Sequence, residues 1–379
     1  MVQNDECIPV GEHYVICRNK EAYKSPAINL IRNLSLLENM ITIPYFGEHY
    51  KKIPIRIHLS HNFIANKEQF PNGSEQINIT TGCIDTYWCL TRLTIFHYDY
   101  FVKENKKDIR TASREELEAI DYYMRRLCLL KMININPHQA IFDELNKWPP
   151  HIPLPGDIME KYNKDDSEAI ASEIALHAVA FILFHECAHS YCGHEKSGPS
   201  IEYEADNLAM EAFFDAKSDQ SKKEKVLFGT MVALSLSFLQ FLNNLRWTSE
   251  SHPSVITRIN KIISKYSNIL SLPPDEYKAD HDSMDMRPII GYAESMLFIW
   301  GQVWPKAFVE TKREIYELTT GNLPDSMELT EADKELLETA SQIKELLESK
   351  KFVNPIDSYH ALSNLLLKSV EEIENGKVI

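Results

Sequence analysis

The stretch Glu173–His194 reads EIALHAVAFILFHECAHSYCGH, and the rest of the chain can be organised around it. Within it, His185, Glu186 and His189 form an H-E-x-x-H pattern. Residues four apart lie one turn apart on one face of a helix, so both imidazoles can reach one metal ion with the glutamate beside them. The run Ala178–Phe184 before the pattern is wholly apolar, which predicts a buried helix. Buried polar groups need partners, and a zinc ion would supply one.

A third metal ligand must come from another segment. The longer pattern H-E-x-x-H-x-x-G-x-x-H fails, because Cys192 and Glu195 stand where it requires glycine and histidine. Glu202 and Asp206 are better candidates, four apart on a second predicted helix. Glu202 would bind the metal, and Asp206 would accept a hydrogen bond from the far nitrogen of a ligand histidine. Glu204 should face elsewhere, because residues two apart do not share a helix face.

Composition limits the classes of function and the compartment. The 379 residues are 44% hydrophobic, enough for a sizeable core. A net charge of −15 argues against nucleic acid as a partner, because phosphate binding needs a basic surface. The seven cysteines are odd in number and show no paired spacing, and the N-terminus has no apolar signal region. We therefore expect reduced thiols in a cytoplasmic protein, with Cys187 and Cys192 as helix packing residues rather than ligands.

One segment has the uncharged character of a membrane span. Val226–Leu245 contains no charged residue, but serine, threonine, glutamine and asparagine interrupt it. A membrane-spanning helix needs about 20 predominantly apolar residues. The segment is therefore predicted to be a core helix, and a peripheral membrane contact stays open.

Two predicted strands precede the metal-binding helix. Ile53–Leu59 and Gln76–Thr81 alternate apolar and other residues, and the turn signal Pro71–Gly73 lies between them. They predict a β-hairpin, followed by a helix from Asp85 or Thr86 to about Lys103. The hairpin can be a scaffold, or its second strand, with Ile77 and Ile79, can be an edge strand that pairs with an extended substrate.

The rest of the chain reads as mainly helical. Helix is predicted over 113–133, where Ser113 and Glu116 form a capping box, and over 167–215, 288–318, 329–349 and 355–373. The proline-rich segment 148–155 must be a loop. The fold class is therefore α+β, mainly α-helical. We divide it into residues 1–265, which carry the motifs, and a helical C-terminal region, 266–379, that acts as a buttress or as a sensor.

Four motifs in this order resemble the HtpX and CAAX-prenyl-protease type of gluzincin metallopeptidase. They are Ile77–Gly82 ending in Thr-Thr-Gly, His185–His189, Glu202–Asp206, and His252-Pro253 followed by Arg258. The resemblance covers about residues 53–262 and implies a zincin-like core. Members of that type are usually multi-span membrane proteins, whereas this chain has one weak candidate span. A narrower likeness is to the phage-exclusion Lit-like peptidase family.

The resemblance implies further site residues and partners. Glu202 would be the third zinc ligand, and His252, just outside a predicted helix, would assist the transition state instead of being an ordinary surface histidine. Asn62, in Asn-Phe-Ile-Ala, would lie near the substrate, and Arg258 would join the substrate-binding set. The Lit-like family implies anti-phage defence by cleavage of a translation factor, elongation factor Tu, once an activating phage peptide is present.

The predicted reaction is zinc-dependent hydrolysis of a peptide bond. Two histidines and a glutamate leave a fourth position for water, whose pKa zinc lowers toward ~7. Glu186 would take the proton of this water and deliver it to the leaving amine, and His252 would donate to the oxyanion. The alternative is a zinc-containing binding or sensor protein with little turnover, in which His194 would be the spare fourth ligand of a closed site. The remaining possibility is that the pattern is accidental and both histidines are core residues.

Overall fold

A computed structural model describes the greater part of the region that carries the motifs. It covers residues 6–10, 14–18, 53–103, 112–135, 137–152, 167–194, 198–215 and 303–321, with residues 30, 225, 227, 229–233, 258, 261–262, 295–296 and 299. His252, Trp300, most of Val226–Leu245 and the predicted helices 329–349 and 355–373 lie outside these residues. The described part is α+β and mainly helical, which confirms the predicted fold class.

The strands form one mixed sheet with the order β1-β2-β3-β5-β4. Their bounds are Glu6–Val10 (β1), Tyr14–Arg18 (β2), Ile55–His58 (β3), Ala65–Gln69 (β4) and Glu75–Thr80 (β5). β2, β3 and β5 run parallel, whereas β1 and β4 pair antiparallel with their neighbours. The two strands expected to form a hairpin, β3 and β5, are therefore parallel neighbours, and that prediction was wrong.

The hairpin of the sheet is formed by β4 and β5. Phe70–Ser74 turn between them, and Gly73 takes the left-handed conformation (φ 79°) that suits glycine. β4 reads Ala-Asn-Lys-Glu-Gln, so it lacks the apolar alternation by which β3 and β5 were found. An edge strand can be this polar, because one side of it is not covered by a neighbouring strand.

The predicted edge position of β5 was also wrong. β5 is paired on one side with β3 and on the other with β4, so its backbone is not free to pair with a substrate. Ile77 and Ile79 are fully buried in the core. They pack in the core between the sheet and the helices, and this burial disfavours the predicted substrate contact.

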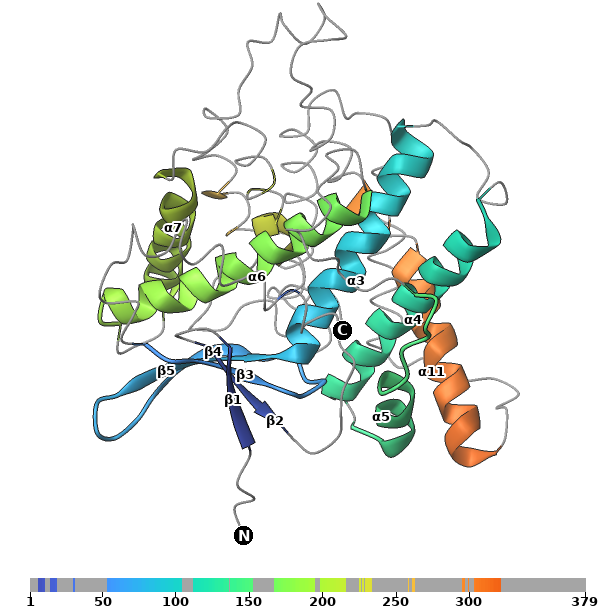
Figure 1. The fold of residues 1–379 in the computed structure, drawn as a ribbon, viewed down its shortest axis with the longest axis horizontal. Coiled ribbons are helices and arrows are strands. Elements are labelled where there is room, and N and C mark those ends of the chain that lie inside the picture. Colours follow the sequence, from blue (N-terminus) through green and yellow to red (C-terminus); the bar gives the residue numbers. More distant parts are fainter. Residues whose placement is uncertain are drawn as a thin grey trace, which may run out of the picture.

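Helices cover one face of the sheet and place the motif helix in the core (Figure 1). The helices are α3 (Thr81–His97), α4 (Arg114–Ile135), α5 (Gln139–Leu145), α6 (Ser167–Tyr191), α7 (Pro199–Asp215) and α11 (Trp304–Thr320), with a π-helical segment, η2, at Tyr98–Lys103. α6 packs between α3 and α7 and reaches the sheet at β4 and β5. α4, α5 and α11 lie on the other side of α3 (Figure 1).

α6 is apolar and long enough to cross a membrane by length and composition alone. The apolar part is Ala169–Tyr191, and 78% of its most apolar window is buried inside the protein. Among the described residues no other helix meets this test. The burial of α6 between α3, α7 and the sheet confirms the buried helix predicted from the apolar run Ala178–Phe184.

α3 begins earlier than predicted, at Thr81. The Thr80 side chain caps it by accepting a hydrogen bond from the Cys83 backbone N–H. Gly82 donates its N–H to the Ser60 carbonyl at 2.7 Å, and a Cβ at this position would lie 2.2 Å from the His61 carbonyl oxygen. The Thr-Thr-Gly sequence therefore allows the chain after β3 to lie directly against the start of α3.

Asp85, predicted as a possible helix start, is buried in the middle of the core. Its carboxylate accepts a hydrogen bond from Arg126 on α4 at 2.7 Å, and both side chains are at most 2% exposed. Arg126 also donates to the Leu145 carbonyl at 2.8 Å and lies over the Trp148 ring at 4.8 Å from its centroid. This buried pair therefore joins α3, α4 and the segment after α5.

Replacing Asp85 by Ala should lower the free energy of unfolding by about 3–5 kcal/mol, because it leaves the buried Arg126 guanidinium without its anion. Urea denaturation followed by circular dichroism measures the change. Glu118→Ala is the control, since it breaks the exposed Arg114–Glu118 pair of α4 and should change little. Equal effects of the two substitutions would contradict this account of the buried pair.

The structure contains the predicted capping box and a helix in the C-terminal region. The Ser113 backbone N–H and hydroxyl donate to Glu116, and the Glu116 N–H donates back to the hydroxyl at 3.2 Å, as predicted. α11 packs on α4 and α5, with Trp304 only 1% exposed. Glu314 of α11 also pairs with Arg125 of α4 at 3.2 Å. These contacts favour the buttress interpretation for residues 303–321, and the domain boundary at 265 stays a prediction.

Candidate metal centre

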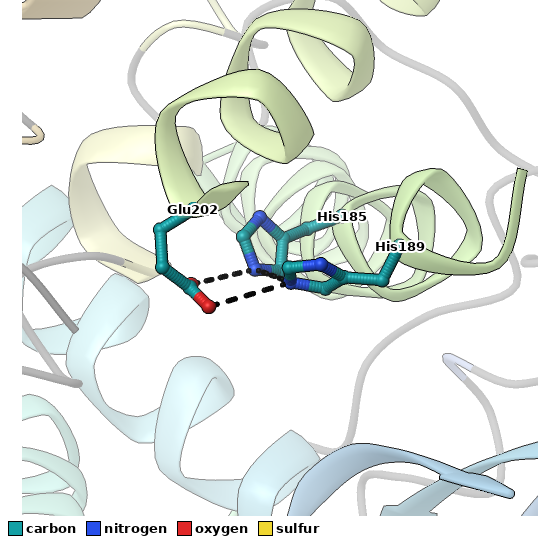
Figure 2. Close-up of side chains that lie close together, drawn as sticks. All are labelled: His185, His189 and Glu202. Carbon is teal, nitrogen blue, oxygen red and sulfur yellow. Dashed lines mark hydrogen bonds and ion pairs between the residues drawn. The ribbon is translucent and has the colours of Figure 1, made fainter. Parts of the chain in front are cut away.

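Three predicted ligands converge where α6 meets α7 (Figure 2). His185 and His189 project from one face of α6, and their Nε2 atoms lie 3.0 Å apart. Glu202, in the first turn of α7, places Oε2 3.3 Å from His185 Nε2 and Oε1 3.6 Å from His189 Nε2. His185 and Glu202 are buried and His189 is half-buried, so the group lies at the edge of the core.

The spacing of these atoms fits a tetrahedral metal ion. Bonds of 2.0–2.2 Å to nitrogen and oxygen place neighbouring tetrahedral ligands about 3.4 Å apart. The three separations, 3.0, 3.3 and 3.6 Å, lie around this value. No fourth His, Cys, Asp or Glu among the described residues joins the group. His185, His189 and Glu202 could thus hold a metal ion and leave one position open.

Asp206 lies behind His185 at the predicted position, within ion-pair distance of the ring but without the alignment of a hydrogen bond. Its Oδ1 is 3.0 Å from His185 Nδ1, the ring nitrogen that faces away from the other ligands. A partner of this kind fixes the ring orientation and makes the ligand nitrogen more basic. Asp206 follows Glu202 by one turn of α7, so a single helix supplies both a ligand and the support of another ligand.

Arg258 completes this support and was missed in that role. Its Nε and Nη2 donate to the two carboxylate oxygens of Asp206 at 2.8 and 2.7 Å. Its Nη1 lies 3.9 Å from Glu202 Oε2. Arg258 is buried, which favours a positioning role over the substrate contact that we predicted. No local pattern marks this pair, because 52 residues separate its members.

The charged side chains around the three ligands shift one another's pKa values. Burial raises the pKa of Asp206, but Arg258 outweighs burial and holds this pKa well below its usual range. Burial lowers the pKa of His185, yet the carboxylates of Asp206 and Glu202 raise it to about 9 overall. Burial and the neighbouring His185 lower the pKa of His189 to about 3. The two carboxylates therefore stabilise a positive charge between the ligands, the position that a cation would take.

Glu186 lies beside the ligands, and a residue of the sheet holds its carboxylate. Its Oε2 accepts a hydrogen bond of 2.8 Å from the backbone N–H of Lys67 on β4. Burial raises the pKa of Glu186, which moves it toward the neutral range in which a general base works best. The sequence could not reveal the role of Lys67, because a backbone N–H leaves no residue signature.

The other predicted site residues are placed as follows. Asn62 is exposed in the turn between β3 and β4, and its backbone N–H donates to Ser60 Oγ at 3.2 Å. His194 does not approach the open position, because its Nδ1 lies 3.0 Å from Nδ1 of His189, on the far side of that ring. His252 lies outside the described residues. The substrate role of Asn62 and the catalytic role of His252 stay predictions.

Asp206→Asn should lower metal affinity by roughly 10–100-fold, the effect typical of residues that orient metal ligands. The amide keeps the shape but removes the charge that pairs with Arg258 and His185. Competition with a chromogenic chelator measures the affinity. Asp143→Asn, an exposed position on α5, is the control. Unchanged affinity in Asp206→Asn would mean that this carboxylate does not support His185.

A comparison with protein families points the same way as the geometry. Residues 77–271 match the profile of the family described as peptidase U49. The chain belongs to the peptidase U49 family. The match begins within β5, covers α3 to α7 and extends past Arg258, so the metal-ligand group lies wholly within the peptidase U49 region. Neither the comparison with curated proteins nor that with solved structures found a match.

Proposed function

We propose that this peptidase U49 protein is a zinc-dependent endopeptidase with a zincin-like core. The observation that carries the proposal is the convergence of His185, His189 and Glu202 at tetrahedral spacing with no fourth described ligand. Closed structural zinc sites use four protein ligands, whereas catalytic sites use three and keep one position open. When bound, zinc supplies Lewis-acid activation of water and of the scissile carbonyl.

In this proposal Glu186 is the general base. Its carboxylate accepts a proton from the attacking water and delivers it to the leaving amine nitrogen. The Lys67 N–H holds one carboxylate oxygen, which fixes the orientation of the other. Arg258 and Asp206 hold the His185 ring, so the ligand set is arranged before substrate arrives. His252 remains the proposed oxyanion donor.

The free edge of β4 is the proposed substrate-binding edge. β4 is the last strand of the sheet among the described residues, and Lys67 on it contacts Glu186. Asn66 and Glu68 pair with β5, so the backbone groups of Ala65 and Gln69 and the Lys67 carbonyl face outward, whereas the Lys67 N–H is held by Glu186. An extended peptide paired with this edge would pass beside the ligand group. The strand-addition prediction is thereby transferred from β5 to β4.

A sensor protein with a closed zinc site is the less favoured alternative. It required His194 as a fourth ligand, but His194 contacts the wrong nitrogen of His189. The carboxylate of Glu186, held beside the ligands by the Lys67 N–H, also has no role in a purely structural site. Both observations favour an enzyme.

The biological role rests on the Lit-like resemblance. We propose a cytoplasmic anti-phage peptidase that cleaves a protein, such as a translation factor, after an activating peptide or protein binds. The supporting features are the motif order, the absence of paired cysteine spacing and the acidic charge. The acidic charge also disfavours nucleic acid, and peripheral membrane contact is left to the test.

The test compares the proteomes of bacterial cells that express the protein or its Glu186→Gln variant, with and without phage infection. New protein termini that appear only with the active protein would identify the substrate. Fractionation of the same cells would show whether the protein sediments with membranes. Identical termini in both cultures under all conditions would contradict the proposed peptidase role.

A further inference from the structure

A second group of metal-ligating side chains lies beside the first. Cys192 and His194 lie in the turn after α6, and Glu204 is on α7. Their sulfur, nitrogen and oxygen atoms all lie within 4.8 Å of one another. Glu204 Oε2 is 3.2 Å from His194 Nε2, and Glu204 Oε1 is 3.9 Å from Cys192 Sγ. Cys192 was expected to be a packing residue, but it is partly exposed and faces a carboxylate.

The backbone holds this turn in place. Gly193 adopts φ 66°, the left-handed conformation that ends many helices, and carries no Cβ to strain it. The N–H of Cys192 donates to Ala188, and the N–H of His194 donates to His189, each at 2.9 Å. Lys67 Nζ on β4 donates to the His194 carbonyl at 3.1 Å. The positions of Cys192 and His194 are therefore defined by α6 and by the sheet.

α7 presents carboxylates to both groups. Glu202 faces the first group and is buried, whereas the Glu204 side chain is 58% exposed and faces the turn. Thiolate, imidazole and carboxylate together are a ligand set that suits zinc and related divalent transition metals. We propose that Cys192, His194 and Glu204 bind a second such ion, taken directly from solvent.

The second site should be weaker than the first. Glu204 is exposed and loses side-chain freedom when it binds an ion, whereas Glu202 is already buried and fixed. The second ion should therefore bind after the first in a titration.

The two sites are in direct contact through two histidine rings. His194 Nδ1 lies 3.0 Å from His189 Nδ1, and a neutral imidazole carries one N–H. When His189 Nε2 faces the first ion, its Nδ1–H donates to His194, whose own N–H then points to Glu204. An ion bound to His194 Nε2 would leave the single N–H of His194 on Nδ1, where it would face the Nδ1–H of His189. Binding of the second ion should therefore lower the affinity of the first site for its ion. This coupling rests on the proposed function, but the existence of the second site does not.

Cobalt(II) titration of the chelator-stripped full chain tests the second site. Thiolate ligation to cobalt gives a strong near-ultraviolet charge-transfer absorption, which a site of two histidines and a glutamate does not give. We expect this band to grow during the second equivalent. Cys192→Ser should lose the band and still bind the first equivalent. Cys187→Ala, which removes a buried thiol of α6, should keep the band.

The outcomes separate this proposal from the proposed function. In His185→Ala the thiolate band should appear with the first equivalent, because only the second site remains. Binding of a single equivalent with no thiolate band, or a band that persists in Cys192→Ser, would overturn the second site. A first equivalent unaffected by His185→Ala, with the Cys192-dependent band intact, would overturn the proposed catalytic site and leave the second site standing.

Discussion

Glu186→Gln should reduce peptide hydrolysis by roughly 10²–10⁴-fold, the usual contribution of general acid–base catalysis. The amide has almost the same size and can still accept the Lys67 N–H through its carbonyl oxygen, so the contact between α6 and β4 persists. It cannot take a proton from water, and this function alone is removed. Fluorogenic peptide hydrolysis and metal analysis of the same preparation give the two readouts.

The metal content separates a catalytic role from a structural one. Glu186 is not among the three converging side chains, so Glu186→Gln should keep one bound ion per chain. Glu115→Gln, an exposed position in the first turn of α4, is the matched control and should keep its activity. Full hydrolysis by Glu186→Gln, or loss of the ion from it, would show that Glu186 is not the base.

His185→Ala should abolish stoichiometric metal binding at the first site. The substitution removes one of three ligands and also the ring that Asp206 supports. The Asp206–Arg258 pair does not depend on this ring and should keep α7 in place. His189→Ala should have the same effect on the metal, because both histidines project into one site.

Elemental analysis after gel filtration measures this loss. His151→Ala, an exposed histidine, is the control and should keep its metal. Circular dichroism verifies that the variants remain helical. If His185→Ala and His189→Ala both retained the full complement of metal, the ion would have to bind elsewhere in the chain.

The sequence predicted best what depends on local spacing. The H-E-x-x-H pattern and the Glu202–Asp206 pair each lie within a few turns of one helix, so periodicity alone brings their members together. The apolar run before His185 predicted the buried helix α6 for the same reason. The capping box of α4 is a four-residue pattern and was equally readable.

The failures lie where distant segments meet or where a strand lacks a pattern. β4 is a polar edge strand and lacks the apolar alternation that marks β3 and β5. Because β4 was not recognised, β3 was predicted to pair antiparallel with β5, whereas the two strands are parallel. The buried pairs of Asp85 with Arg126 and Asp206 with Arg258 join separate elements, and nothing local marks them. Lys67 acts on Glu186 through its backbone, which any residue except proline could do.

Anomalous X-ray diffraction at the zinc edge, from crystals loaded with one equivalent of zinc, tests the central claim most directly. The account predicts one peak in contact with His185 Nε2, His189 Nε2 and the Glu202 carboxylate, at about 2.0–2.2 Å from each. A fully loaded protein whose only zinc peak lies away from these three side chains would contradict it.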